Sequence, residues 1–124
     1  MKNKIFLVLR ILLGVFILIF GSNKFLEFMP GFELTGDAKA YWDALVSAKV
    51  ISLVGIVEVV SGLALIFNKW GSLMSVILMS VPVNAVLFHA TLDPGNIAPA
   101  LVFLTLNIIA LVGYKDNYVE MLRG

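Results

Sequence analysis

Four long runs of apolar residues dominate the chain, and short polar stretches separate them. The runs cover residues 5–20, 50–67, 73–88 and 97–114. A transmembrane helix needs about 20 mainly apolar residues at a rise of about 1.5 Å each. Every run reaches or approaches that length once its flanks are included. The pattern therefore predicts an all-α, polytopic membrane protein with one domain, residues 1–124. Its four spans are expected at about residues 5–25, 48–67, 71–89 and 97–114.

The connections after the second and third runs are short, and this predicts how the helices are arranged. Residues 68–71 read as a tight turn, and residues 93–96 contain a strong turn signal, Asp-Pro-Gly-Asn. Such short links force consecutive spans to be antiparallel neighbours. The expected architecture is therefore an antiparallel four-helix bundle.

The connection after the first run is the longest irregular part of the chain. Pro30-Gly31 should end the first helix, and Asp37 should cap a short helix that begins at the next residue. Tyr41 and Trp42 on this helix suit the headgroup layer of a membrane. We therefore expect an interfacial segment between the first two spans, serving either as a membrane anchor or as a lid over a ligand.

Composition supports the membrane class and removes several others. Hydrophobic residues make up 60% of the chain and charged residues 14%, which would leave a soluble domain too little polar surface. The net charge of +1 gives no reason to expect a nucleic-acid partner. The chain has no cysteine and one histidine. We therefore expect no disulfide, no thiol relay, no protein-held metal site and no covalent cofactor.

Charge placement predicts the orientation. With four spans, both termini lie on the same side as Lys2, Lys4, Lys69, Lys115 and Arg123. The opposite side carries an excess of acids, namely Glu27, Glu33, Asp37, Asp43 and Asp93. Because basic residues concentrate in cytoplasmic segments, both termini are expected in the cytoplasm. The first run carries Arg10 and lacks a small-residue cleavage site, so it is expected to remain an uncleaved span.

Polar residues within the apolar runs are the main candidates for function. Small residues and Arg10 share one stripe of the first helix with Lys24, and Glu58 lies near the bilayer centre on the second. Counting from the inner boundary places Arg10, Asn107 and Glu58 roughly 9, 12 and 16 Å deep. We therefore predict an inner cluster of these three residues. It serves either proton handling or, as a structural ion pair, helix register.

A second polar group is predicted toward the outer side. His89 closes the third run, Asn84 lies more than a turn below it, and Lys24 ends the first run at similar height. Trp42, Asp43 and Asp93 are expected to stand over them. Pro82 removes a backbone hydrogen bond and should kink the third helix near Asn84. His89 is read either as a titrating functional group or as an interfacial hydrogen-bonding residue.

The chain resembles the DoxX-like family of small bacterial membrane proteins. The resemblance rests on three segments: Arg10-x-x-x-Gly14 with Gly21-Ser22-Asn23-Lys24-Phe25, Val57-Glu58-Val59-Val60-Ser61-Gly62, and above all Pro82-Val83-Asn84-Ala85-Val86-Leu87-Phe88-His89. It implies a multi-pass protein of the bacterial cytoplasmic (inner) membrane. Some relatives are named as the membrane part of a thiosulfate:quinone oxidoreductase, and others associate with sulfur-transfer and superoxide-detoxifying proteins. A more distant likeness is to transmembrane chaperones that assist receptor assembly in animals.

Two main functional hypotheses follow. The first is a membrane component of a redox or sulfur-metabolism system that binds quinone. His89 and Lys24 would offer donors, Asn84 would lie below them, and Glu58 would carry protons. Since the chain has no haem pair, thiol pair or flavin motif, electrons would come from a membrane or soluble redox partner. The second is a non-enzymatic scaffold or assembly factor that binds lipid, another membrane protein or a second copy of itself.

A third hypothesis, transport of protons or small solutes, would need a polar path between the two groups. Ser61, Ser80 and Thr105 are the candidate steps along it. We assign no catalytic residue from the sequence.

Overall fold

The computed structural model describes residues 2–27 and 34–123, with side chains from residue 4 onward. Within these ranges the chain forms helices joined by short turns, and the predicted helix end at Pro30-Gly31 lies outside them. The elements are α1 (Lys2–Leu26), α2 (Gly36–Ser47), α3 (Val50–Phe67), α4 (Gly71–Leu78), α5 (Ser80–Leu92), η1 (Pro94–Asn96), α6 (Ala98–Gly113), η2 (Lys115–Tyr118) and α7 (Val119–Leu122).

Three helical stretches are long and apolar enough to cross a membrane. They are Lys4–Leu26, Val50–Phe67 and Gly71–Leu92, the last of which joins α4 to α5. α6 has only 16 residues. It is long enough for a further span only if it is counted together with Lys115–Leu122, which bends away from it by 70°. The prediction of an all-α protein with several membrane-spanning helices is confirmed at this level.

The third apolar run is interrupted between α4 and α5, close to the predicted kink. Pro82 has no N–H, and its ring clashes with the carbonyl four residues earlier in a regular helix. The amide of Met79 turns to the carbonyl of Val76 at 3.2 Å, and the helix resumes at Ser80. The predicted distortion is therefore present, and it lies about one turn before Pro82.

α1 packs most extensively against α3, and small residues allow the two backbones to approach. Gly14 faces Gly62: a Cβ atom on Gly62 would lie 2.8 Å from the carbonyl oxygen of Gly14. Further along α1, a Cβ atom on Gly21 would lie 2.8 Å from Cβ of Glu58. Higher numbers on α1 thus meet lower numbers on α3, so the two helices are antiparallel.

The core fills the space between this pair and the other helices. Its buried members are Leu13, Ile17, Leu65, Leu78, Phe103, Leu106, Ala110 and Tyr114. In contrast, the outer face of α3 exposes Leu53, Ile56 and Val60. An apolar face turned outward is what a lipid-exposed helix requires.

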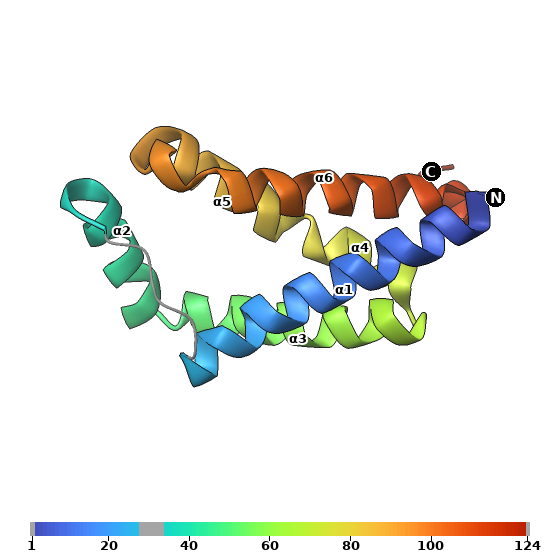
Figure 1. The fold of residues 1–124 in the computed structure, drawn as a ribbon, viewed down its shortest axis with the longest axis horizontal. Helices are drawn as coiled ribbons and strands as arrows, with labels where there is room; N and C mark the ends of the chain where they lie inside the picture. The colour runs from blue at the N-terminus through green and yellow to red at the C-terminus, as the bar shows by residue number, and fades with distance from the viewer. Residues whose placement is uncertain (1, 28–33, 124) are drawn as a thin grey trace.

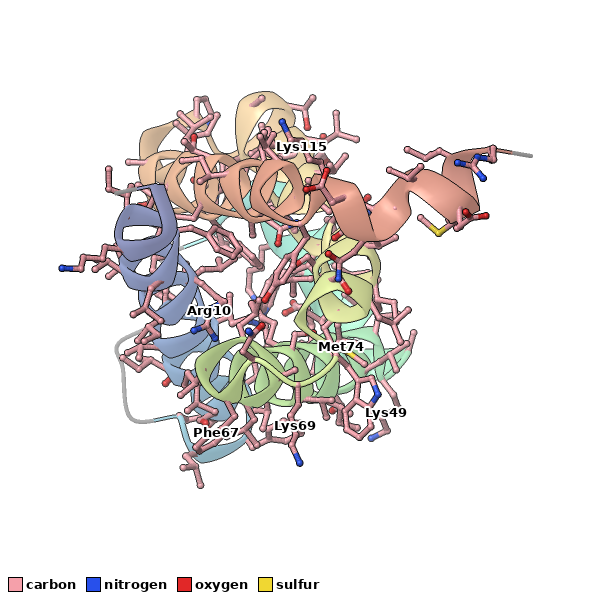
Figure 2. All side chains as sticks on the ribbon, turned by 90° about the vertical axis from the view of Figure 1, so that its right-hand side faces the viewer. Arg10, Lys49, Phe67, Lys69, Met74 and Lys115 are labelled. Carbon is pink, nitrogen blue, oxygen red and sulfur yellow. The ribbon has the colours of Figure 1, made fainter. Side chains whose placement is uncertain are left out.

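Figure 1 shows the overall arrangement. α1 and α3 form one layer, and α5 and α6 lie along the other. The layers approach each other at the end that holds both termini, and they separate toward α2. Figure 2 views the terminal end, where α1, α3, α4 and α6 surround the core. This difference between the two ends decides where a pocket can form.

α2 lies at the wider end and differs slightly from its predicted start. Thr35 occupies the N-cap with extended backbone angles, and Asp37 lies in the first helical turn. The prediction that Asp37 caps the helix is therefore wrong, although a carboxylate in the first turn still favours the positive end of the helix dipole. At the other end, Lys49 adopts a left-handed conformation with φ of 67° and turns the chain into α3.

Candidate functional site

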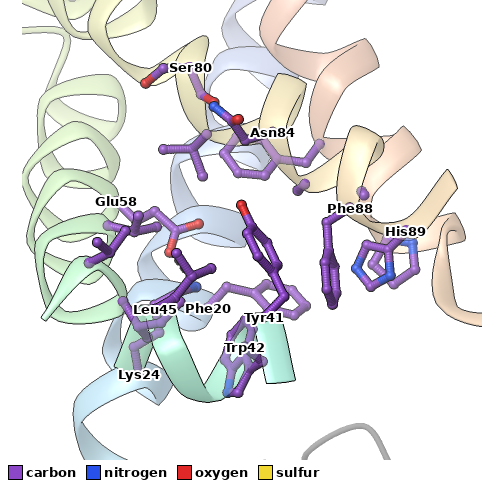
Figure 3. Close-up of a pocket in the computed structure, with 18 of the residues that line it drawn as sticks. Phe20, Lys24, Tyr41, Trp42, Leu45, Glu58, Ser80, Asn84, Phe88 and His89 are labelled. Atoms are coloured by element: carbon purple, nitrogen blue, oxygen red, sulfur yellow. Dashed lines mark hydrogen bonds and ion pairs between the residues drawn. The ribbon is translucent and has the colours of Figure 1, made fainter. Parts of the chain in front are cut away.

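A cavity of ≈ 390 Å³ lies at the wider end of the molecule, among α1, α2, α3, α5 and α6. This volume falls within the range of about 300–1,000 Å³ that is typical of small-molecule pockets. Most of the wall is apolar. Its polar lining consists of Lys24, Tyr41, Trp42, Glu58, Ser80, Asn84 and His89. Figure 3 shows these side chains around the pocket, contributed by α1, α2, α3 and α5.

Lys24 and Glu58 form an ion pair in the wall of the pocket. The Lys24 Nζ lies 2.6 Å from Glu58 Oε1, and the two side chains are 18% and 3% exposed. Lys24 comes from the last turn of α1, whereas Glu58 lies at the middle of α3. The close approach at Gly21 places the backbone of α1 beside Glu58. The pair therefore depends on the glycine packing between these helices.

Arg10 has a different role from the predicted one. Its Nη1 donates hydrogen bonds to the carbonyls of Leu65 and, at 3.4 Å, of Ile66. The last carbonyls of a helix have no partner within the helix. The guanidinium therefore caps α3 and compensates the negative end of its dipole. Figure 2 shows Arg10 directed from α1 toward α3.

Asn107 serves the interruption between α4 and α5. Its Nδ2 donates to the carbonyl of Ser75 at 3.1 Å and lies 3.7 Å from the sulfur of Met79. Because the Met79 amide bonds to Val76, Asn107 supplies the donor that a regular helix would give to Ser75. The predicted cluster of Arg10, Glu58 and Asn107 is thus wrong: each residue contacts a different part of the chain.

His89 reaches the pocket from the last turn of α5. Its Nδ1 lies 3.2 Å from Oδ2 of Asp93, which indicates that Nδ1 donates to the carboxylate. Asp93 also accepts hydrogen bonds from Asn96 Nδ2 at 3.0 Å to each oxygen. The imidazole is buried and packs edge-on against Phe88, with ring centroids 5.0 Å apart. These contacts hold the ring in one orientation.

The other residues of the predicted outer group are divided. The structure brings Asn84, Lys24 and Trp42 to the same pocket as His89. Asp43 instead lies on the exposed side of α2, paired with Lys39 at 2.9 Å. Asn84 forms a hydrogen bond within its own helix, because its Nδ2 donates to the carbonyl of Ser80 at 2.6 Å.

Aromatic side chains complete the walls, and most of them were not singled out from the sequence. The Tyr41 ring stacks on Phe88 with centroids 5.5 Å apart and planes at 26°. Trp42 lies at 6.5 Å from the same ring. Phe16, Phe20 and Phe103 also line the cavity. A phenylalanine within an apolar run carries no signal that separates a pocket wall from a lipid-facing surface.

The described residues do not form a continuous polar path between the two predicted polar groups. Ser80 lines the pocket and donates to the carbonyl of Ile77 at 3.1 Å. Thr105 is exposed on α6 and donates to the carbonyl of Leu101 at 2.8 Å. Ser61 is fully buried, and no described residue forms a hydrogen bond with its hydroxyl. These three hydroxyls therefore lie in separate environments.

The pocket can accommodate a small amphipathic molecule, with aromatic walls for a ring and ionised or hydrogen-bonding groups beside it. Among residues 2–27 and 34–123, no three His, Cys, Asp or Glu side chains gather as a possible metal site. No curated protein and no solved structure matches the chain. The DoxX family profile matches residues 5–91, more than two thirds of the sequence and most of the pocket. The chain belongs to the DoxX family.

Proposed function

We propose that this DoxX-family protein is a membrane component of a redox or sulfur-metabolism system that binds a quinone in the pocket among α1, α2, α3, α5 and α6. The observation that carries the proposal is the combination of aromatic walls with the Lys24–Glu58 pair and His89 around a cavity of ≈ 390 Å³. A quinone headgroup needs a flat apolar slot and hydrogen-bond donors for its carbonyls. Both kinds of surface are present here.

Each polar group has a defined part in this proposal. Lys24 supplies an N–H donor to one carbonyl oxygen. The protonated form of His89 supplies Nε2–H to the other, while its Nδ1–H stays on Asp93, which keeps the imidazole oriented. Glu58 accepts or releases a proton as the bound ring changes its redox state, since a carboxylate buried in a membrane helix is a natural proton carrier. The chain has no cysteine, so the electrons come from a separate membrane or soluble redox partner.

The proposed setting is the bacterial cytoplasmic membrane, with four spans. In this topology α6 and the bent segment that follows it form the fourth span, and the bundle is antiparallel. The basic residues near the termini and at Lys69 support a cytoplasmic location for both ends. The pocket then faces the outer half of the membrane, and a quinone reaches it from the bilayer.

A scaffold or assembly factor is the second candidate, and one observation favours it. The Lys24–Glu58 pair neutralises a buried carboxylate without any ligand. Fixing the register of α1 against α3 would therefore be a sufficient role for Glu58. In that case the partner is lipid, another membrane protein or a second copy of the chain. The glycine faces of α1 and α3 are already used for their mutual contact.

Mass spectrometry of small molecules extracted from the protein in mild detergent tests the proposal. The wild type is expected to retain about one quinone per chain, and Glu58→Gln and His89→Ala are expected to retain little. Glu120→Gln is the matched control, because Glu120 is exposed and pairs with Arg123 far from the pocket. If quinone is absent from the wild type, or equal in all four proteins, the quinone proposal is wrong and the scaffold becomes the better account.

A further inference from the structure

Tyr41 lines the pocket, a position that a role as an interfacial aromatic residue does not explain. Its ring stacks on Phe88, and Figure 3 shows its hydroxyl directed away from α2 into the pocket. No residue in the described part of the chain exchanges a hydrogen bond with this hydroxyl. Tyr41 is 43% exposed, so its hydroxyl is open to a ligand that enters the pocket. The pocket therefore holds an unused donor from α2.

The charges that line the pocket are already compensated. Lys24 pairs with Glu58 at 2.6 Å, and His89 contacts the Asp93 carboxylate at 3.2 Å. An anionic ligand would compete with Glu58 for Lys24 and bring a second negative charge beside a buried carboxylate, which is unfavourable. A cation would have to compete with Lys24 for the same carboxylate. The pocket therefore disfavours both kinds of charged ligand.

The remaining polar side chains in the wall have backbone partners three or four residues earlier in the chain, or point elsewhere. Ser80 donates to Ile77, and Asn84 donates to Ser80. The indole nitrogen of Trp42 faces away from the cavity in Figure 3. The Tyr41 hydroxyl is thus the best placed group for an uncharged acceptor atom on a ligand.

We infer that the pocket selects an electrically neutral ring compound and that the Tyr41 hydroxyl donates the hydrogen bond that recognises it. The inference rests on the proposed quinone function and deepens it. It names the ligand property that is recognised, a neutral ring with an acceptor atom, and the residue that recognises it, Tyr41. It also gives α2 a role: this helix carries the specificity-determining side chain into the pocket beside Phe88. The helix is therefore part of the binding site.

The two tryptophans allow a direct binding measurement. Trp42 lines the pocket, whereas Trp70 is exposed in the turn at the other end of α3. In a Trp70→Phe protein, fluorescence reports on the pocket alone, and quinones quench it on contact. The probes are 2-methyl-1,4-naphthoquinone, which is neutral, and 1,4-naphthoquinone-2-sulfonate, which is anionic. A Trp42→Phe protein measures quenching by probe that merely dissolves in the detergent.

The neutral probe is expected to quench Trp42 saturably, with at least about tenfold tighter binding than the sulfonate. Tyr41→Phe keeps the ring and removes the hydroxyl, so it should weaken binding of the neutral probe about five- to tenfold. Tyr118→Phe is the matched control, because that hydroxyl donates to the carbonyl of Ser72 at 2.8 Å, at the opposite end of the molecule. It should leave the affinity unchanged.

The outcomes separate this inference from the function on which it rests. Saturable binding that is equal in the wild type and Tyr41→Phe overturns the role of Tyr41 but leaves quinone binding intact. Equal affinity for the neutral and anionic probes overturns the selection against charge. Quenching by both probes that never saturates, as in the Trp42→Phe protein, overturns both the inference and the proposed function.

Discussion

The Nζ of Lys24 lies 2.6 Å from Oε1 of Glu58 and joins the last turn of α1 to the middle of α3. Glu58 is 3% exposed, so this contact decides whether its charge is tolerated. The partner comes from the C-terminal end of α1, where a lysine can extend its flexible side chain along the helix. The same pair lines the pocket, so packing and ligand binding are linked at one point.

Glu58→Gln should therefore lower stability as well as quinone retention. Removing one member of a buried pair costs about 3–5 kcal/mol, and the partial exposure of Lys24 reduces the expected loss to roughly 2 kcal/mol. The double variant Lys24→Met with Glu58→Leu should recover most of this stability, because apolar groups replace both charges. Thermal unfolding in detergent measures each change.

Quinone retention in the double variant separates the two roles of Glu58. We expect stability to return without the ligand, because the polar groups of the pocket are lost. Recovery of both would show that the pair acts only through packing.

Arg10→Met should destabilise the protein by about 1–2 kcal/mol, because two terminal carbonyls of α3 lose their charged donor. Its effect should add to that of Glu58→Gln, since the two side chains have different partners. A double-mutant cycle on thermal stability measures the coupling. A coupling energy above about 1 kcal/mol would instead support a direct Arg10–Glu58 interaction.

Gly62→Ala should cost about 1–3 kcal/mol, because its Cβ would lie 2.8 Å from the carbonyl oxygen of Gly14 and push α1 from α3. Gly95→Ala is a suitable comparison, since no atom lies within 4 Å of the added Cβ. Melting temperatures of the two variants test this directly. Equal values would argue against the close helix contact.

Asn107→Leu should lower stability by about 1 kcal/mol, because the Ser75 carbonyl loses its donor where the helix is interrupted. Thr105→Val on the exposed face of α6 provides the control. Hydrogen exchange at the amides around Met79 should rise in the Asn107 variant alone. Unchanged exchange there would mean that Asn107 does not support the interruption.

Several features followed from residues that act locally. Long apolar runs specify helices of membrane length. Pro82 lacks an N–H and therefore disrupts its helix, whatever that helix packs against. The segments around Lys24, Glu58 and His89 also carried the family resemblance, which the profile match confirms. The glycines of α1 and α3 predicted that each helix has a face suited to close packing, but they did not predict that Gly14 meets Gly62.

The partners of the polar side chains depended on how the helices rotate and slide against each other. Depth counting placed Arg10 and Asn107 in one cluster with Glu58. The antiparallel packing through Gly14 and Gly62 instead sets Arg10 against the end of α3, and Glu58 pairs with Lys24. Likewise, Tyr41 and Phe88 are distant in sequence and meet only because α2 folds over α5. Helix formation depends on residues that are neighbours in sequence. A pocket depends on contacts between helices, which no local sequence pattern specifies.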